Sequence, residues 1–385
     1  MKHGNEQLPL YSQIGQFIME RIRSGDWPAG YKIPPEAEIA EQFGVSRITV
    51  RKALERFIEN GTIYRVRGKG SYVSGDVDPD HPADESGRKS IAFIITRLHN
   101  SFSAHLLSGI NSVISNSGYN LVFFESFDRL DTETELLDKA IRLGVEGIIV
   151  LPVRGETFNK TILQLTMKQF PLVVIDRYLR GIKTNTVCTD NLSGARAGTA
   201  HLLEAGHARI GYVTEAFEGT SSLEDRLTGY ELALTDRQIA VDHRLRLVVP
   251  ELQPDESTEQ RPAPFTETAD WDEPLIEAIE RFVTEHADMT AIFAATYVLG
   301  IHVLEALRRM ALPVPERMSV LFFDDYDLSF LSRVAPTVVR QPDEEIGRAA
   351  ARLLLSVIAE PEREPSRIML PARVIVREST RELPS

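Results

Sequence analysis

A basic stretch near the start of the chain carries side chains that could bind phosphate groups. Residues 45–73, VSRITVRKALERFIENGTIYRVRGKGSYV, hold seven Lys and Arg against two Glu, in a chain of 385 residues with a formal net charge of -13. Lys and Arg neutralise the backbone phosphates of nucleic acids, and Arg also binds base edges. The stretch therefore predicts a nucleic-acid contact, and it needs elements that present its cations together.

Three short amphipathic helices are predicted to position these cations. The first begins near Tyr11, and the second lies between Pro35 and Gly44. Ser46 is a natural N-cap for the third helix. A turn containing glycine separates the third helix from the second helix. Two helices joined in this way predict a helix-turn-helix reader whose third helix enters the DNA major groove. The candidate contacts on this helix are Ser46, Arg47, Thr49, Arg51 and Lys52.

The residues after the third helix predict a wing. TIYRVRGKGSYV alternates apolar and basic residues around a glycine turn, as a β-hairpin does. Arg67, Gly68 and Lys69 are the candidate contacts at its tip. A phosphate loop is excluded because the spacing G-x-x-x-x-G-K-[ST] is absent. A solvated basic face on a helical adaptor is the alternative, but a capped helix, a turn and a hairpin together favour a winged helix-turn-helix.

The segment KIPPEAEIAEQFGVSRITVRKALERFIENGTIYRVRGKGSYV resembles the DNA-binding domain of the GntR family of bacterial regulators. Two positions depart from the family pattern, since Pro35 replaces the usual Ser and Ala37 replaces an Arg that contacts DNA in many members. The resemblance implies DNA contacts at Ser46, Arg47, Thr49, Arg51, Gly68 and Lys69.

The rest of the chain differs in charge. Residues 1–75 hold eleven basic and eight acidic residues, whereas residues 76–385 hold 32 basic and 48 acidic ones. The segment SGDVDPDHPADESGRKS is rich in Pro and acids and predicts a solvated linker over 76–89. We therefore expect one domain over 1–75 and a larger one over 90–385. An acidic, Pro-rich segment near 250–270 is interpreted as an insertion loop without a legible function.

Seven apolar runs in the larger part predict buried parallel strands that alternate with helices. They are IAFIIT, NLVFFE, GIIVLPV, PLVVID, RIGYVT, AIFAAT and SVLFFDD. Continuous apolar runs are typical of strands that are covered on both faces. Nearly three hundred residues exceed one ordinary core, so we expect two doubly wound α/β subdomains with a cleft between them.

Polar residues that follow these strands are the candidates for ligand binding, because open α/β sheets bind ligands beyond the carboxyl ends of their strands. Phe102 could stack on a sugar face, and carboxylates and guanidinium groups could bind hydroxyls. A surface ion pair or helix cap is the alternative for each residue alone, but their shared position favours a ligand site. The candidates are Asn100, Phe102, Asp176, Arg177, Arg226, Asp324 and Gln341.

Residues 90–380 resemble the effector-binding domain of LacI/GalR regulators through AFIITRLHNSFSAHLLSGI, VIDRY, RLTGYELAL and PTVVRQPDEEIGRAAARLLL. The resemblance implies two α/β subdomains of periplasmic-binding-protein type and a sugar effector. Where relatives use Asn-Asp after the sixth strand, this chain has Thr296-Tyr297, which implies a different set of ligand hydroxyls. A GntR-type head on such a domain is similar to the arabinose-responsive repressors of Gram-positive bacteria, and it implies a pentose such as L-arabinose.

The two parts together predict a homodimeric repressor that binds palindromic operator DNA through two heads and releases it when a small sugar binds. Two alternatives remain open, an activator and a sensor of a sugar phosphate or another small metabolite. Arg177 and Arg226 would also suit a phosphate.

An enzyme finds little support in the sequence. No G-x-G-x-x-G follows a strand, and no G-x-S-x-G elbow is present. His201 and His207 are six residues apart and therefore on different sides of a helix, so they do not form a metal pair. The single Cys188, the start MKHGNEQLPL and the lack of a long apolar run fit a soluble cytoplasmic protein. We expect no cofactor, no metal and no membrane association.

Overall fold

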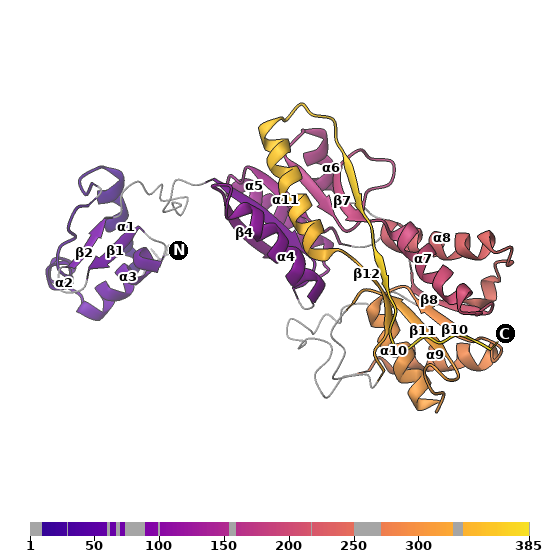
Figure 1. Ribbon diagram of the computed structural model, residues 1–385. Helices are drawn as coiled ribbons and strands as arrows, with labels where there is room; N and C mark the ends of the chain where they lie inside the picture. The colour runs from indigo at the N-terminus through magenta and orange to yellow at the C-terminus, as the bar shows by residue number, and fades with distance from the viewer. Residues whose placement is uncertain are drawn as a thin grey trace, which may run out of the picture. The chain divides into compact units, whose positions relative to one another are not determined.

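The computed structural model describes residues 10–28, 30–59, 62–66, 70–73, 89–98, 101–153, 159–216, 218–249, 271–325 and 334–384. The chain divides into two compact units, Met1–Arg88 and Lys89–Ser385. We call them the head and the effector unit and treat each by itself (Figure 1). Most of the predicted linker over 76–89 and the predicted insertion near 250–270 lie outside the described residues.

The head contains the three predicted helices and the predicted hairpin. They are α1 (Leu10–Arg23), α2 (Glu36–Phe43), α3 (Arg47–Glu59), β1 (Ile63–Val66) and β2 (Gly70–Val73). Gly44 ends α2 with a φ of 60°, a left-handed conformation that glycine adopts without strain. The Ser46 hydroxyl accepts from the Thr49 amide at 3.2 Å, as an N-cap does. These sequence predictions are confirmed, and β1 and β2 pair antiparallel.

The core of the head lies between its three helices and the hairpin. On α3 the buried side chains are Val50, Ala53, Leu54 and Phe57. Phe17 on α1 contacts the rings of Trp27 and Phe43 edge to face, at centroid distances of 5.9 and 5.1 Å. Because these four apolar residues of α3 point inward at helical spacing, the positions at the start of the helix other than Val50 are left on or near the surface.

The effector unit holds alternating strands and helices, as predicted. Its helices are α4 (Ser101–Ile114), α5 (Leu130–Arg142), α6 (Lys160–Met167), α7 (Asn191–Glu204), α8 (Ser221–Asp236), α9 (Glu273–Glu285), α10 (Tyr297–Arg309) and α11 (Asp343–Ala359), with a 3-10 turn at His243–Leu245. Its strands are β3 (Ser90–Ile95), β4 (Asn120–Glu125), β5 (Gly147–Val150), β6 (Leu172–Ile175), β7 (Asn185–Thr189), β8 (Ile210–Glu215), β9 (Arg246–Val249), β10 (Ala291–Ala294), β11 (Ser319–Phe323), β12 (Thr337–Arg340), β13 (Arg367–Leu370) and β14 (Arg373–Ile375).

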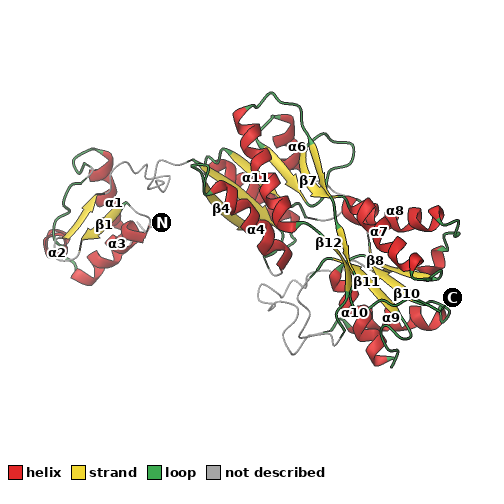
Figure 2. Ribbon diagram, viewed as in Figure 1, coloured by secondary structure: helices red, strands yellow, loops and turns green. Residues whose placement is uncertain are grey.

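These strands form two six-stranded sheets within the described residues. The first has the order β13-β7-β6-β5-β3-β4, and the second has the order β14-β12-β11-β10-β8-β9 (Figure 2). All pairings are parallel except that of β12 with β14. All seven predicted strands are present, and β7, β9, β12, β13 and β14 complete the sheets. The prediction of two doubly wound α/β subdomains is confirmed.

Both faces of each sheet are covered, which explains the continuous apolar runs. On β3, Ile91 and Phe93 belong to the core with α4 and α11, whereas Ala92 and Ile94 belong to the core with α5 and α6. Successive side chains of a strand point to opposite faces, so every position of a central strand is buried.

The chain passes between the two subdomains at three places within the described residues. It leaves the first sheet after β7 to form α7, returns after β12 to form α11, and leaves again between β13 and β14. The first subdomain therefore consists of the described residues within 89–189 and 343–370, and the second of those within 191–340 and 373–384. Residues at the ends of β7 and β12 consequently lie where the two subdomains join.

Glycines allow two helices of the first subdomain to pack backbone to backbone. A Cβ atom added to Gly347 on α11 would lie 2.3 Å from the backbone oxygen of Leu106 on α4. A Cβ added to Gly109 on α4 would lie 2.2 Å from the Glu344 oxygen. Neither backbone can move aside without shifting its whole helix, so both positions require glycine.

We therefore expect Gly347→Ala to lower the free energy of unfolding of the effector unit by about 1–3 kcal/mol, the usual cost of overpacking a core. Urea denaturation of the full-length protein measures this change. Arg352→Ala, on an exposed position of the same helix, is the control and should change stability by less than about 0.5 kcal/mol. Equal stability of Gly347→Ala and wild type would contradict the close contact of α4 with α11.

Candidate DNA-binding and effector-binding sites

The start of α3 presents the predicted DNA contacts on the surface of the head. Arg47, Arg51 and Lys52 are exposed, and Thr49 is half-buried. The Ser46 and Thr49 hydroxyls lie 2.9 Å apart. Since Ser46 also caps the helix, its hydroxyl fixes the first turn from which the two arginines extend. This group of residues on α3 is the candidate reading surface.

A glutamate that the sequence analysis did not single out joins the reading surface to the wing. The Arg51 guanidinium donates to the Glu36 carboxylate at 3.4 Å, and Arg65 on β1 forms an ion pair with the other oxygen of the same carboxylate. About half of each arginine side chain remains exposed, against 20% of Glu36. Exposed ion pairs contribute little to stability, so the main effect of Glu36 is to orient the Arg51 and Arg65 side chains.

The base of the wing is described, but its tip is not. Tyr64 on β1 stacks on Tyr72 on β2 at a centroid distance of 5.6 Å, and Lys32 forms an antiparallel bridge with Tyr72. The predicted contacts Arg67, Gly68 and Lys69 lie outside the described residues, and their role stays a prediction.

Arg226 on α8 is the most buried charged residue among the predicted effector contacts. Its side chain is only 5% exposed. The guanidinium donates to the Asn191 side-chain oxygen at 2.8 Å and to the Ala295 carbonyl at 2.7 Å, and it lies 3.9 Å from the centre of the Phe323 ring. Asp324 lies 4.0 Å away and supplies the opposite charge. A buried charge is tolerated because these groups together satisfy it.

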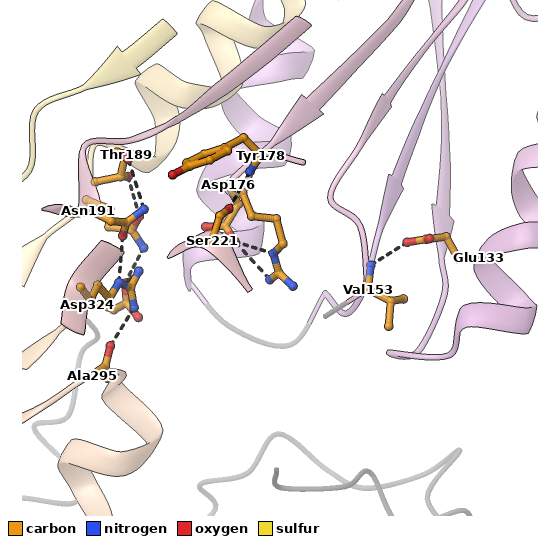
Figure 3. A network of polar contacts seen from close by, with 12 residues as sticks. Glu133, Val153, Asp176, Tyr178, Thr189, Asn191, Ser221, Ala295 and Asp324 are labelled. Carbon is orange, nitrogen blue, oxygen red and sulfur yellow. Dashed lines mark hydrogen bonds and ion pairs between the residues drawn. The ribbon is translucent and has the colours of Figure 1, made fainter. Parts of the chain in front are cut away.

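Gln341 extends this arrangement to the first subdomain. Its side-chain amide donates to Asp324 at 2.5 Å, and its side-chain oxygen accepts from the Thr189 hydroxyl at 2.5 Å. Thr189 ends β7 and Gln341 follows β12, the two places where the chain changes subdomain. Figure 3 shows Thr189, Asn191, Asp324 and Ala295 grouped in this network. We call Arg226, Asp324, Gln341, Thr189 and Asn191 the crossover network.

Asp176 and Asp324 occupy matching positions in the two subdomains. Each is the first residue after a central strand, each has a positive φ, of 68° and 75°, and each donates its amide to the neighbouring strand, at Val187 and Val339. Non-glycine residues with positive φ are uncommon, although Asp tolerates this conformation better than most. Such backbone conformations are concentrated at functional sites.

Arg177 forms an ion pair with its neighbour Asp176, at 3.2 Å between the guanidinium and the carboxylate. Further into the first subdomain, Glu133 on α5 is fully buried and accepts from the Val153 amide at 2.7 Å (Figure 3). It also accepts from the Asn159 side chain at 2.8 Å. Burial raises the pKa of Glu133, while these hydrogen bonds and the charge of Arg177 act in the opposite direction. Sequence reasoning missed Glu133.

Three other predicted contacts have structural partners of their own. Phe102 packs against the core of the first subdomain, Thr296 caps α10 by accepting from the Leu299 amide at 3.4 Å, and Tyr297 is buried in a core of the second subdomain. Asn100 lies outside the described residues. Their part in effector binding stays a prediction.

Asp343, the first residue of α11, is a further acidic group at the junction that the sequence analysis missed. Burial and the negative charges of Asp324 and Asp176 raise the pKa of Asp343 to about 8. His105 on α4 lies 3.5 Å from its carboxyl. Because aspartates from both subdomains act on Asp343, its carboxyl links the crossover network electrostatically to Asp176.

A second contact joins the subdomains next to the crossover network. The Tyr178 hydroxyl of the first subdomain donates to Asp225 on α8 at 2.9 Å. The Ser221 hydroxyl accepts from the Tyr178 amide at 2.9 Å, and Figure 3 shows Tyr178 and Ser221 side by side. Arg367 on β13 lies over the Tyr178 ring at 3.8 Å. The Tyr178 hydroxyl and the Asp225 carboxyl can form hydrogen bonds with the hydroxyl groups of a ligand.

Among the described residues, no cluster of His, Cys, Asp and Glu could hold a metal ion, and no helix is long and apolar enough to cross a membrane.

Family comparisons cover both units. Residues 10–73 match the model of bacterial regulatory proteins of the gntR family. Residues 88–251 match the model of periplasmic binding proteins and the sugar binding domain of the LacI family, and residues 199–380 match the model of a periplasmic binding protein-like domain.

Two solved structures share the fold of this chain. A complex of the transcriptional regulator CelR with cellobiose has a TM-score of 0.62 at 23% identity, and the match covers 90% of this chain and all of that one. CcpA of Lactococcus lactis has a TM-score of 0.64 at 18% identity over 76% of this chain and 99% of that chain, and both show the fold.

Two curated relatives extend over nearly the whole chain. The arabinose metabolism transcriptional repressor of Geobacillus stearothermophilus is 30% identical and covers 98% of this chain and 99% of its own length. The corresponding repressor of Halalkalibacterium halodurans is 29% identical over 97% of each chain. With a GntR-type head, a LacI-type effector unit and this full-length similarity, the chain belongs to the family of arabinose metabolism transcriptional repressors.

Proposed function

We propose that the protein acts as a homodimer, that its head over residues 1–75 holds operator DNA, and that a neutral monosaccharide bound to its effector domain over residues 90–385 releases it. L-Arabinose is the first candidate, because the two full-length relatives carry the name of arabinose metabolism repressors. Two heads on a symmetric dimer fit two half-sites of a palindrome.

The crossover network is the observation that carries the effector assignment. It brings donors and acceptors together after the carboxyl ends of strands, where open α/β sheets bind ligands. Its members come from both subdomains, and Thr189, Asn191 and Gln341 lie where the chain passes between them. A sugar whose hydroxyls bonded to these groups would therefore bias the relative position of the subdomains, and a ligand can shift an equilibrium only by binding its two states differently.

The charges at the junction favour a neutral sugar over a sugar phosphate. Arg177 pairs with Asp176, Arg226 lies 4.0 Å from Asp324, and Asp343 adds a third carboxyl group. A phosphate would bring additional negative charge next to the carboxylates of Asp176 and Asp324, whereas the protonated Asp343 could donate a hydrogen bond to a hydroxyl. Hydroxyl groups, in contrast, can both donate to the aspartates and accept from the arginines.

Arg47→Ala and Arg51→Ala should weaken binding to operator DNA by about 1–3 kcal/mol each, the usual contribution of an Arg that reads a base. Fluorescence anisotropy of the operator and of a scrambled duplex measures it. Arg21→Ala is the matched control, because Arg21 is an exposed arginine on α1 paired with Asp26. Wild-type affinity of both α3 variants would remove α3 from the DNA interface.

Arg226→Ala should bind operator DNA normally but fail to release it at L-arabinose concentrations that release wild type. Loss of charged hydrogen bonds to the sugar would reduce its affinity about tenfold or more. Operator release is titrated by anisotropy, and sugar binding is followed by the shift in melting temperature. Arg177→Ala, which truncates a largely buried side chain of the first subdomain, provides a second test.

Arg209→Ala is the control for this experiment, because Arg209 is also an ion-paired arginine of the second subdomain, bonded to Asp242 and Asp288. It should release DNA as wild type does. Release of DNA by both Arg226→Ala and Arg177→Ala at the wild-type sugar concentration would exclude these arginines as sugar contacts.

The protonation of Asp343 generates a prediction on stability. An Asp in the unfolded chain ionises near pH 4, whereas burial and neighbouring acids hold the pKa of Asp343 at about 8 in the folded protein. The folded state thus binds more protons between these values, so this contribution to stability is complete below about pH 4 and is lost as the pH rises to about 8.

Asp343→Asn cannot titrate, so it should lose less stability than wild type when the pH is raised from about 5 to about 8. Urea denaturation at several pH values measures the free energy of unfolding of both proteins. The buried histidines contribute equally to both, so their contribution cancels when the variant is compared with wild type. The exposed Asp138→Asn on α5 is the control and should follow wild type. Identical pH profiles of Asp343→Asn and wild type would show that Asp343 is ionised in the folded protein.

A further inference from the structure

Ile48 combines an apolar side chain with an unusually exposed position on the reading surface. It follows Arg47 in the first turn of α3 and is 74% exposed. The other apolar residues described on this helix, Val50, Ala53, Leu54 and Phe57, are at most 8% exposed. Single exposed apolar residues are common on proteins, so its neighbours must decide whether the position has a purpose.

Ile48 is surrounded by the cations of the reading surface. Residues three and four positions apart share one face of a helix, which places Arg51 and Lys52 beside Ile48. Arg47 precedes it in the chain, and the Ser46 cap fixes the turn that carries it. Glu36 holds the Arg51 guanidinium at 3.4 Å next to this face. An apolar group framed by cations suits a surface whose rim is anionic and whose floor includes apolar groups.

The DNA major groove offers such a surface. Phosphates line its edges, and among the four bases only thymine presents an apolar group there, its C5-methyl. The other base edges expose hydrogen-bond donors and acceptors, which an isoleucine side chain would cover without satisfying them. An isoleucine that enters the groove between phosphate-binding cations can therefore favour thymine over the other bases.

We propose that Ile48 is a specificity-determining residue of the reading surface and that it contacts the C5-methyl group of a thymine in each operator half-site. This inference rests on the assignment of α3 as the recognition helix. It adds direct reading of a base by an apolar contact to the reading by arginine.

The test uses the full-length protein and a duplex that it selects from a library with a randomised centre. Each thymine of the selected duplex is then replaced singly by deoxyuridine, which removes the methyl group and leaves the base-pairing edge unchanged. Burial of a methyl-sized group contributes about 0.8 kcal/mol. We therefore expect a loss of affinity of about fourfold at one thymine of each half-site.

The variant Ile48→Ala should bind the thymine duplex more weakly and should be insensitive to deoxyuridine at the same position. This double-mutant cycle separates the contact from any effect of deoxyuridine on the DNA itself. Met167→Ala, which truncates an 84% exposed side chain of the effector unit, is the matched control and should retain the full sensitivity. Since Ile48 is exposed, its variant should melt at the wild-type temperature.

The outcomes separate this inference from the proposed function. The inference is overturned if wild type binds all deoxyuridine duplexes with unchanged affinity, if Ile48→Ala keeps the wild-type sensitivity, or if the selected half-sites contain no thymine. Weaker binding by Arg47→Ala and Arg51→Ala in the same assay would then leave the reading helix in place. If these variants bind normally, or if no duplex is selected, the recognition helix and the role of Ile48 fail together.

Discussion

A buried guanidinium group needs hydrogen-bond and ion-pair partners for its charge and its N–H groups. At Arg226 these partners come from several strand ends, which must therefore lie close together. Moving a charge out of water is costly, and partners must compensate for it. The partners of Arg226 are the Asn191 side chain after β7, the Ala295 carbonyl after β10, and Phe323 and Asp324 at the end of β11. The position of one side chain thus depends on three strand ends, and Gln341 adds that of β12.

The same requirement makes the junction sensitive to a ligand. The hydrogen bonds of Thr189, Gln341 and Asp324 form a chain between the subdomains, and sugar hydroxyls could replace or extend them because each can donate and accept. Removal of any member would leave a buried polar group without its bond, at a cost similar to that of a lost hydrogen bond. The free energy difference between the hydrogen-bond networks with and without sugar would therefore exceed the contribution of any single hydrogen bond.

The sequence predicted the strands with long apolar runs, including the partly buried β4, and it missed strands whose apolar runs are short or interrupted by polar residues. β7 reads NTVCT, and its Thr186 is fully buried with its hydroxyl 3.0 Å from that of Thr184, the residue before the strand. β13 has alternating exposure at the sheet edge and gave no continuous run. Asp343 resembled an ordinary first-turn acid of a helix. Its burial arises from the passage of the chain between subdomains, which no local pattern encodes.

In the head, local signals were sufficient because the structure there is local. Ser46 caps α3 through an amide three residues away, and Gly44 ends α2 through its own backbone conformation. Glu36 is the exception, because it meets Arg51 and Arg65, 15 and 29 residues away. Its carboxylate attracts both guanidinium groups, whereas the phosphates of DNA would compete for them. Each arginine is therefore held in place by an exposed ion pair that costs little to break, so the head can present oriented cations and transfer them to DNA with a small loss of free energy.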